Sequence, residues 1–496
     1  MKAHWLLALA ILSVCFAPGT AESQNSAATD ECLNCHATIH PGIVEGWKKS
    51  RHAAATPAGA LAVEGLGKKV TGQAIPDELK KVAVGCAECH TMNPKSHKDT
   101  TDHNGYDIHV VVSPKDCSVC HTQEAEQFDK NLMAHAYGIL VNNSVYQMLV
   151  HAINDTPVFE KGKLAQKPSN ALTEADACLY CHGTKLEVTG TRTVETDMGE
   201  MTFPIISGWP NQGVGRINLD GSRGSCAACH TRHEFSIEMA RKPYTCKECH
   251  VGPDVPANKV YEASKHGNIF SAKNEEWNFT NVPWTVGKDF TAPTCAACHM
   301  SLLVDTEGKV VVQRSHEVKN RLPWRIFGLI YAHSHPKEPD TTIIRNKDGL
   351  SLPTDLAGGS ADQFLYNEKE REAATKEMQA SCLSCHHKTW VDGAWERFVN
   401  SISETNAATL AGTRIMSDIW KLGLAVNHEK GGNPFDEFIE RVWSDTWLFY
   451  SNSVRFASAM GGGGDYGVFA DGRYHLSKSV RHLEDWLNQR KSRKKQ

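Results

Sequence analysis

The chain has 496 residues, a formal net charge of −4 and 17 cysteines. Its 53 Lys and Arg residues are balanced by 57 Asp and Glu residues, so it lacks the basic excess that marks a nucleic-acid-binding protein. Beyond residue 17, no apolar stretch approaches the ~20 residues that a membrane helix needs. This composition argues against a membrane-spanning protein and against a nucleic-acid partner.

The first predicted element is a secretory signal peptide over residues 1–21. Lys2 precedes an apolar run over residues 5–17, and small residues follow at positions 19–21. We therefore expect export to the periplasm or an equivalent extracytoplasmic compartment, with Cys15 removed along with the signal. A lipoprotein anchor at Cys15 is disfavoured because Val14 stands where a small residue is expected.

Downstream of the signal, the pattern Cys-x-x-Cys-His occurs eight times. Two thiols at this spacing can bond the two vinyl groups of one haem, and the following His can ligate its iron. Zinc sites, dithiol pairs and disulfide frameworks do not explain a His after every pair. The pattern therefore predicts eight covalently bound haem c groups and a redox function. The predicted attachment cysteines are Cys32, Cys35, Cys86, Cys89, Cys117, Cys120, Cys178, Cys181, Cys226, Cys229, Cys246, Cys249, Cys295, Cys298, Cys382 and Cys385. The proximal iron ligands are His36, His90, His121, His182, His230, His250, His299 and His386.

Residues 22–390 are predicted to form the haem-binding body. Eight haems in the exported chain amount to one per ~60 residues, so the porphyrins supply much of the buried apolar surface. Proline and glycine punctuate this region, and regular structure should be modest there. The predicted fold class is mainly α, a multihaem cytochrome c wrapped around its cofactors.

Residues 391–496 are predicted to form a long helical C-terminal region. Trp395, Phe398 and Ile402 share one helical face, a second helix is predicted to open at Asn433 and Pro434, and a third over about residues 476–486. Aromatic residues recur along one face of each predicted helix, and together they form more apolar surface than a single helix can bury by itself. We expect them to support oligomerisation, with coverage of haem faces inside one chain as the alternative.

Each haem iron has a second axial position, which decides whether the haem can bind substrate. An iron with two His ligands is saturated and only transfers electrons, so an enzyme needs at least one open iron. The candidate distal ligands are His52, His97, His109, His135, His233, His266, His316 and His387. The spacing does not assign them to individual haems.

The middle of the chain resembles the octahaem hydroxylamine oxidoreductase family. The resemblance is carried by residues 178–184, 209–222, 226–236 and 246–254, and it extends over nearly the whole exported chain. Pentahaem nitrite reductases typically have one motif with Lys in place of His, and this chain has none.

The resemblance implies a homotrimer with seven bis-His haems and one open catalytic haem, on Cys178, Cys181 and His182. In oxidising members a Tyr from a neighbouring subunit is bonded to that haem. Tyr466 is the best positional match and Tyr474 the second choice, although a Tyr beside Gly461–Gly464 can also simply pack at a turn. Such a bond would favour removing electrons from the substrate.

Two further pocket residues follow from the resemblance. Asp254 matches the family's general base, and Tyr331 could donate a hydrogen bond to a bound N or O atom. Oxidising members usually have a His after the Asp, where this chain has Val255. His333 or His335 could take the place of that imidazole.

Three functions are consistent with the sequence. The favoured one is oxidation of hydroxylamine or hydrazine, with electrons passed to a soluble c-type cytochrome. The second is reduction of nitrite or hydroxylamine on the same scaffold. The third is a non-enzymatic electron conduit.

Overall fold

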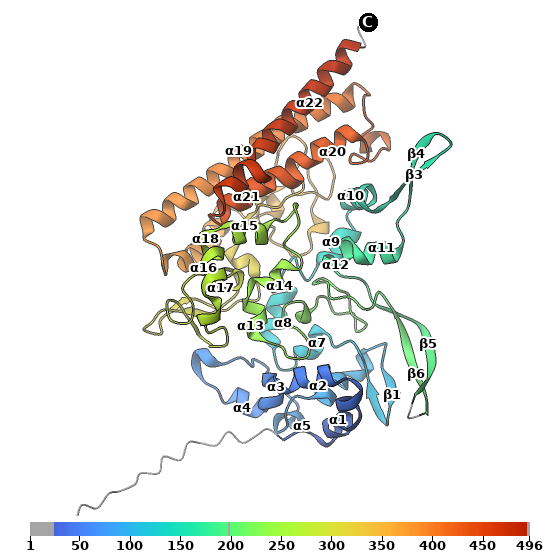
Figure 1. Ribbon diagram of the computed structural model, residues 1–496, viewed down its shortest axis with the longest axis vertical. Helices are drawn as coiled ribbons and strands as arrows, with labels where there is room; N and C mark the ends of the chain where they lie inside the picture. Colours follow the sequence, from blue (N-terminus) through green and yellow to red (C-terminus); the bar gives the residue numbers. More distant parts are fainter. Residues whose placement is uncertain (1–23, 197–198, 494–496) are drawn as a thin grey trace, which may run out of the picture.

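The computed structural model describes residues 24–196 and 199–493, so the predicted signal peptide lies outside the described residues. Figure 1 shows an elongated molecule with the N-terminal helices at one end and long C-terminal helices at the other. The haem motifs lie along the chain between these ends. The mainly α prediction agrees with this arrangement, and every described helix is too short or too polar to cross a bilayer.

Short helices make up the haem-binding body. Many begin at a residue suited to the position, such as Ser26, whose hydroxyl accepts from the Thr29 N–H, or Pro41 and Pro57 in the first turn. The helices are α1 (Ala27–Ile39), α2 (Pro41–Lys48), α3 (Arg51–Ala54), α4 (Pro57–Leu61), α5 (Asp77–Lys80), α6 (Cys86–His90), α7 (Pro114–Cys117), α8 (Thr122–Asp129), α9 (Ala136–Val141), α10 (Ser144–Asn154), α11 (Ala171–Asp176), α12 (Cys178–His182), α13 (Ile237–Arg241), α14 (Pro243–Lys247), α15 (Ala257–Ala263), α16 (Lys265–Lys273) and α17 (Cys295–His299).

Small sheets, which the sequence analysis did not predict, interrupt the helices. The hairpins β3–β4 and β5–β6 project from the same side of the molecule (Figure 1). Among the strands of the described residues, β7 and β8 are the one pair that runs in parallel. The strands are β1 (Thr101–His103), β2 (Tyr106–Ile108), β3 (Thr156–Glu160), β4 (Lys163–Lys167), β5 (Glu187–Thr196), β6 (Gly199–Ser207), β7 (Trp284–Thr285), β8 (Leu303–Val304), β9 (Val310–Val312), β10 (Trp324–Arg325) and β11 (His333–Ser334).

The C-terminal region is helical, as predicted. The helices begin before the predicted boundary at residue 391. They are α18 (Glu368–Leu383), α19 (Lys388–Lys421), α20 (Phe438–Asp445), the π-helix η9 (Thr446–Ser451), α21 (Asn452–Ala459), the π-helix η10 (Tyr466–Ala470) and α22 (Arg473–Arg493). The helix expected to open at Asn433 starts later, at Phe438. The Asn433 side chain closes a turn by accepting from the Phe435 N–H at 3.1 Å, and Glu437 caps the helix together with Glu440.

The C-terminal helices bury most of their aromatic stripe against one another. Trp443 of α20 and Trp447 of η9 are 2% and 0% exposed. They pack with Met416 of α19 and Leu483 of α22 in the largest apolar cluster of the described residues. Packing within one chain therefore buries most of the aromatic side chains of these helices. A few, such as Phe438 and Phe469, stay exposed.

Candidate active site

Five proximal imidazoles face a second imidazole across a gap that fits one metal ion. Two metal–nitrogen bonds of about 2 Å each, together with the ring radii, place two ligand rings about 6 Å apart. The observed centroid separations are 6.1 Å for His36 and His103, 6.4 Å for His90 and His233, 6.2 Å for His121 and His52, 6.4 Å for His230 and His316, and 6.1 Å for His386 and His266. Four of the eight predicted distal ligands thus lie opposite a proximal His.

Backbone hydrogen bonds orient the proximal rings. Nδ1 of His90 donates to the His109 carbonyl at 2.8 Å, that of His121 to the Lys69 carbonyl at 3.2 Å, and that of His182 to the Ala136 carbonyl at 3.1 Å. Each Nε2 is thereby left to face a metal. Burial also lowers the pKa of His230 and His299 to about 4, so both rings are neutral and can ligate. Paired thiols and neutral imidazoles are the donor set that haem c requires.

The predicted roles of His97 and His109 do not agree with the geometry. Their rings stack on each other 3.5 Å apart, which leaves no room for a porphyrin between them. The His109 ring centroid lies 6.3 Å from that of His90, in the range of the five facing pairs, but the His109 carbonyl accepts from Nδ1 of His90. We therefore favour His233 over His109 as the distal ligand opposite His90.

His135 and His387 also have other partners. Nε2 of His135 donates to the Asp129 carbonyl at 2.9 Å. His387 is exposed and caps α19, where its Nδ1 accepts from the Thr389 N–H at 3.3 Å. His103 was not among the predicted ligands. It ends β1 just before the tight Asn104-Gly105 turn, and this dipeptide is a hairpin signal that could have located it.

Three proximal histidines remain without a facing imidazole among the described residues: His182, His250 and His299. Two buried imidazoles are left to match them, His333 and His335. Their Nδ1 atoms donate to the backbone carbonyls of residues 334 and 336, and burial lowers the pKa of both rings to about 3. Nε2 of His333 is buried and has no hydrogen-bond partner among the described residues, which suits a nitrogen that ligates a metal.

Thiols of different motifs lie within hydrogen-bonding reach of each other. The contacts join Cys117 to Cys226, Cys181 to Cys249, and Cys246 to Cys295. Groups attached at these positions would therefore be close neighbours. Through the contact of Cys181 with Cys249, the fourth Cys-x-x-Cys-His motif adjoins the sixth motif and not the fifth.

Two charged side chains flank the fourth motif. Burial lowers the pKa of His182, and the nearby charges of Asp254 and Arg325 act on it in opposite directions. Asp254 also acts on Cys178 and on His250. Nη1 of Arg325 is buried and has no hydrogen-bond partner among the described residues.

The two predicted tyrosines lie in different surroundings. The buried Tyr331 hydroxyl donates to the Leu356 carbonyl at 2.9 Å, and burial raises its pKa to about 12. Tyr466 begins η10 half-buried, with its hydroxyl 3.4 Å from a carboxylate oxygen of Asp471 in the same chain. Tyr474, the second choice, is 53% exposed on α22.

Arg455 ties the pocket loops to the C-terminal helices. Its fully buried guanidinium donates to Thr405 Oγ1 at 3.0 Å, Asn406 Oδ1 at 2.7 Å, Asn452 Oδ1 at 3.1 Å and the Ile326 carbonyl at 3.3 Å. The Asn452 amide in turn donates to the Asp254 carbonyl at 3.0 Å. The position of Asp254 thus depends on a chain of hydrogen bonds that begins in α19 and α21.

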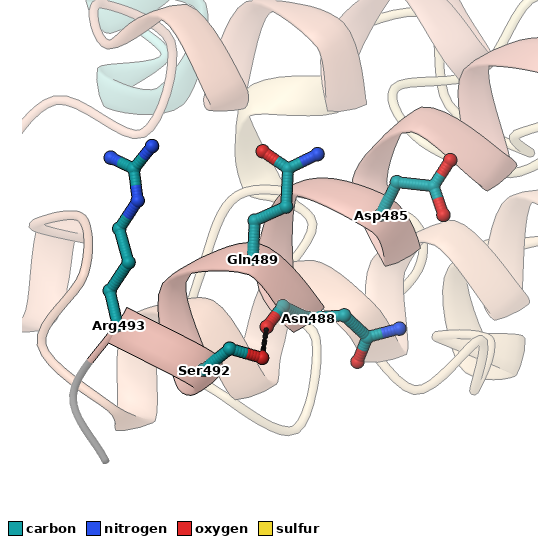
Figure 2. A pocket seen from close by; sticks show the side chains of 5 residues that line it. All are labelled: Asp485, Asn488, Gln489, Ser492 and Arg493. Carbon is teal, nitrogen blue, oxygen red and sulfur yellow. Dashed lines mark hydrogen bonds between the residues drawn. The ribbon is translucent and has the colours of Figure 1, made fainter. Parts of the chain in front are cut away.

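A hollow beside α22 does not belong to this site. It is lined by Asp485, Asn488, Gln489, Ser492 and Arg493, and the only bond among them joins the Ser492 hydroxyl to the Asn488 carbonyl at 3.0 Å (Figure 2). None of the predicted site residues lines it.

The motifs and the paired imidazoles define a multihaem c-type cytochrome. Residues 215–326 match a family described as seven times multi-haem cytochrome CxxCH, and residues 116–202 match cytochrome c554 and c-prime. A solved structure titled hypothetical multiheme protein is 39% identical, with a TM-score of 0.89, and covers 95% of this chain and 97% of its own. The chain belongs to the hydroxylamine oxidoreductase-like family of multihaem cytochromes, which confirms the resemblance seen in the sequence.

Two relatives from Kuenenia stuttgartiensis are more distant. A probable nitrite reductase-hydroxylamine oxidoreductase fusion protein is 26% identical over 404 residues, which are 78% of this chain. The matched region is only 38% of the fusion protein. A structure of a reducing HAO-like protein complex is 18% identical, with a TM-score of 0.60, and covers 93% of this chain and 85% of its own; it shares the fold.

Proposed function

We propose that this protein is an oxidoreductase for small inorganic nitrogen compounds, with catalysis at the haem held by Cys178, Cys181 and His182. The observation that carries the proposal is the count of imidazoles. Three proximal histidines lack a facing ring, and His333 and His335 are the two buried imidazoles that we assign to two of them. This assignment would leave one iron open, and we place it at His182, on which the charges of Asp254 and Arg325 both act.

The haem supplies the redox chemistry when it is bound, and the protein supplies charge, protons and orientation. Arg325 is suited to attract an anion, because its buried Nη1 has no other partner among the described residues. Asp254 lies near the same motif and can hold or release a proton. The Asn452 amide fixes the Asp254 backbone at 3.0 Å.

These residues favour reduction of nitrite over oxidation of hydroxylamine. Reducing nitrite to nitric oxide takes up one electron and two protons and releases water, so the pocket must attract an anion and deliver protons. Oxidation instead needs groups that collect protons, yet Val255 replaces the family's imidazole. His333 and His335, which could have replaced it, are needed as iron ligands in this proposal.

Oxidation of hydroxylamine or hydrazine is the second candidate, and it depends on Tyr466. The phenol is half-buried, and its contact with Asp471 is long, at 3.4 Å, so a move toward a haem of another subunit would cost little there. The exposed aromatic side chains of α20 and η10, including Phe438 and Phe469, support a homotrimer in which this would occur. We further propose an extracytoplasmic location and a soluble c-type cytochrome as redox partner.

The decisive experiment compares both directions on the purified holoprotein. Nitrite consumption is measured with reduced methyl viologen, and hydroxylamine oxidation with oxidised cytochrome c. We expect the first reaction to be faster, one high-spin haem by electron paramagnetic resonance, and an intact mass without a cross-link at Tyr466. Eight low-spin haems would contradict the proposal and indicate an electron conduit.

A matched pair of variants tests the pocket charge. Arg325→Gln should raise the KM for nitrite about tenfold or more and leave the KM for uncharged hydroxylamine unchanged, since a buried charge interaction is worth on the order of 1.4 kcal/mol or more. Arg314→Gln removes an arginine paired with Glu124 away from His182 and should change neither value. Equal effects of both variants on both substrates would remove Arg325 from the pocket.

A further inference from the structure

A buried cluster joins two histidines and two aspartates from the segment between the second and third haem motifs with Asp220, which follows the fourth motif. We propose that His97, His109, Asp116 and Asp220 form a binding site for one divalent transition-metal ion other than haem iron. Potential ligand atoms of His97, His109 and Asp116 all lie within 4.8 Å of one another. These are the histidines that the haem geometry leaves unused.

The spacing around His97 matches that of ligands around one ion. Its Nε2 lies 3.1 Å from Asp116 Oδ2 and 4.0 Å from Asp220 Oδ2. Two atoms bound to one metal at about 2.1 Å lie roughly 3 to 4 Å apart in tetrahedral or octahedral geometry. His109 stacks on His97, and its buried Nδ1 has no hydrogen-bond partner among the described residues.

Asp99 holds His97 from the opposite side. Asp99 Oδ1 lies 3.5 Å from His97 Nδ1, while Oδ2 accepts from the Val110 and Val111 N–H groups at 3.2 and 3.4 Å. At this distance the two atoms make no hydrogen bond, but a metal-ligating imidazole commonly has a carboxylate beside its second ring nitrogen, and Asp99 occupies that place. His97 therefore has the surroundings of a metal ligand.

The charge of the cluster also calls for a cation. The side chains of His97, Asp99 and Asp220 are 0% exposed, and that of Asp116 is 2% exposed. Three carboxylates share this volume, and Arg216 interacts with Asp220 from nearby.

The donor set narrows the choice of metal. Two imidazoles and two carboxylates suit zinc, manganese or ferrous iron, whereas calcium and magnesium prefer oxygen ligands alone. The ion would be structural, because the ligands are buried and an open path for substrate is not present at these fully buried side chains. The ion would connect the segment before Cys117, which contains His97, His109 and Asp116, to Asp220, which follows the motif at Cys178 in the sequence.

Occupancy should also affect the neighbouring haems. The His109 carbonyl accepts from Nδ1 of His90, and Asp116 directly precedes Cys117. A bound cation here should raise the reduction potentials of the haems on the second and third motifs, because it stabilises added electrons. This readout does not depend on enzyme activity.

The test uses the eight-haem holoprotein, stripped with EDTA and then equilibrated with Zn²⁺ alone. Elemental analysis should find one zinc per protein in the native chain and none in Asp220→Asn. The matched control is Asp355→Asn, which changes a buried aspartate paired with Lys347 far from this cluster and should keep the zinc. Haem content and the Soret spectrum check that each variant is folded.

A crystal structure with anomalous data at the zinc edge locates the ion. A peak between His97 Nε2 and Asp116, together with raised potentials of two haems, supports the site. Zinc-free native protein, or equal zinc in Asp220→Asn, would overturn it and identify the cluster as a network that shares protons only.

Discussion

Replacing Arg455 by Met tests how firmly the pocket is tied to the C-terminal helices. The guanidinium is 0% exposed and makes four hydrogen bonds, none of them to a carboxylate. Methionine fills a similar volume but donates nothing. The Thr405, Asn452 and Ile326 oxygens would lose this donor, whereas Asn406 Oδ1 still accepts from the Ala332 N–H.

The expected loss follows from the buried acceptors. Each one left without a donor costs about 1–3 kcal/mol, and desolvation of the removed charge offsets part of the sum. We therefore expect a net loss of about 3 kcal/mol in the free energy of unfolding. The unfolding entropy of ~2.1 cal/mol/K per residue gives about 1 kcal/mol per degree for a chain of this length, so Tm should fall by about 3 °C.

Calorimetry on the holoprotein measures this change. The control is Arg473→Met, which removes an exposed ion pair with Glu404 and should cost less than about 1 kcal/mol. Loss of the Asn452 contact should also loosen Asp254 and lower kcat. Equal Tm values for the two variants would refute the argument that the Arg455 network stabilises the fold.

Three further predictions concern the pocket, the iron ligands and pH. Asp254→Asn should lower kcat for nitrite by about 10² or more while all haem spectra stay unchanged, since general acid–base groups contribute ~10²–10⁴; unchanged kcat would remove Asp254 from the mechanism. His52→Gly should convert one low-spin haem to high-spin in the paramagnetic resonance spectrum, whereas His97→Gln should leave the low-spin count intact. Burial raises the pKa of Glu440 to about 7 from 4.5, so its protonated form stabilises the fold below pH 4.5 and this stability is lost as pH rises through 7. Glu440→Gln should therefore raise Tm at pH 8 and leave it nearly unchanged at pH 5; the same shift at both values would assign the effect to packing.

The sequence predicted what depends on short-range spacing. Haem attachment is encoded within five residues, so the motifs could be found without a structure. The helical face of Trp395 and Phe398 was equally visible and lies in α19. The later start of α20 could not be predicted from the sequence, because the Asn433 side chain closes a turn instead of capping the helix.

Distal ligands were harder to predict because they come from distant parts of the chain. His233 faces His90 and His316 faces His230, and no local pattern records either pairing. His97 and His109 looked equally suitable, yet they stack on each other beside Asp116. His103 was overlooked because its β-hairpin was not predicted in a region expected to be mainly helical.

The facing imidazoles have a consequence for how the chain folds. Once iron is bound, each pair closes a loop of the chain, the shortest between residues 36 and 103 and the longest between residues 90 and 233. In the chain-entropy view of cross-links, closing a loop of about 100 residues restricts the unfolded chain by ~4–5 kcal/mol. The irons would then act as five cross-links within a body that has few long helices. A chain exported without haem should therefore remain unfolded.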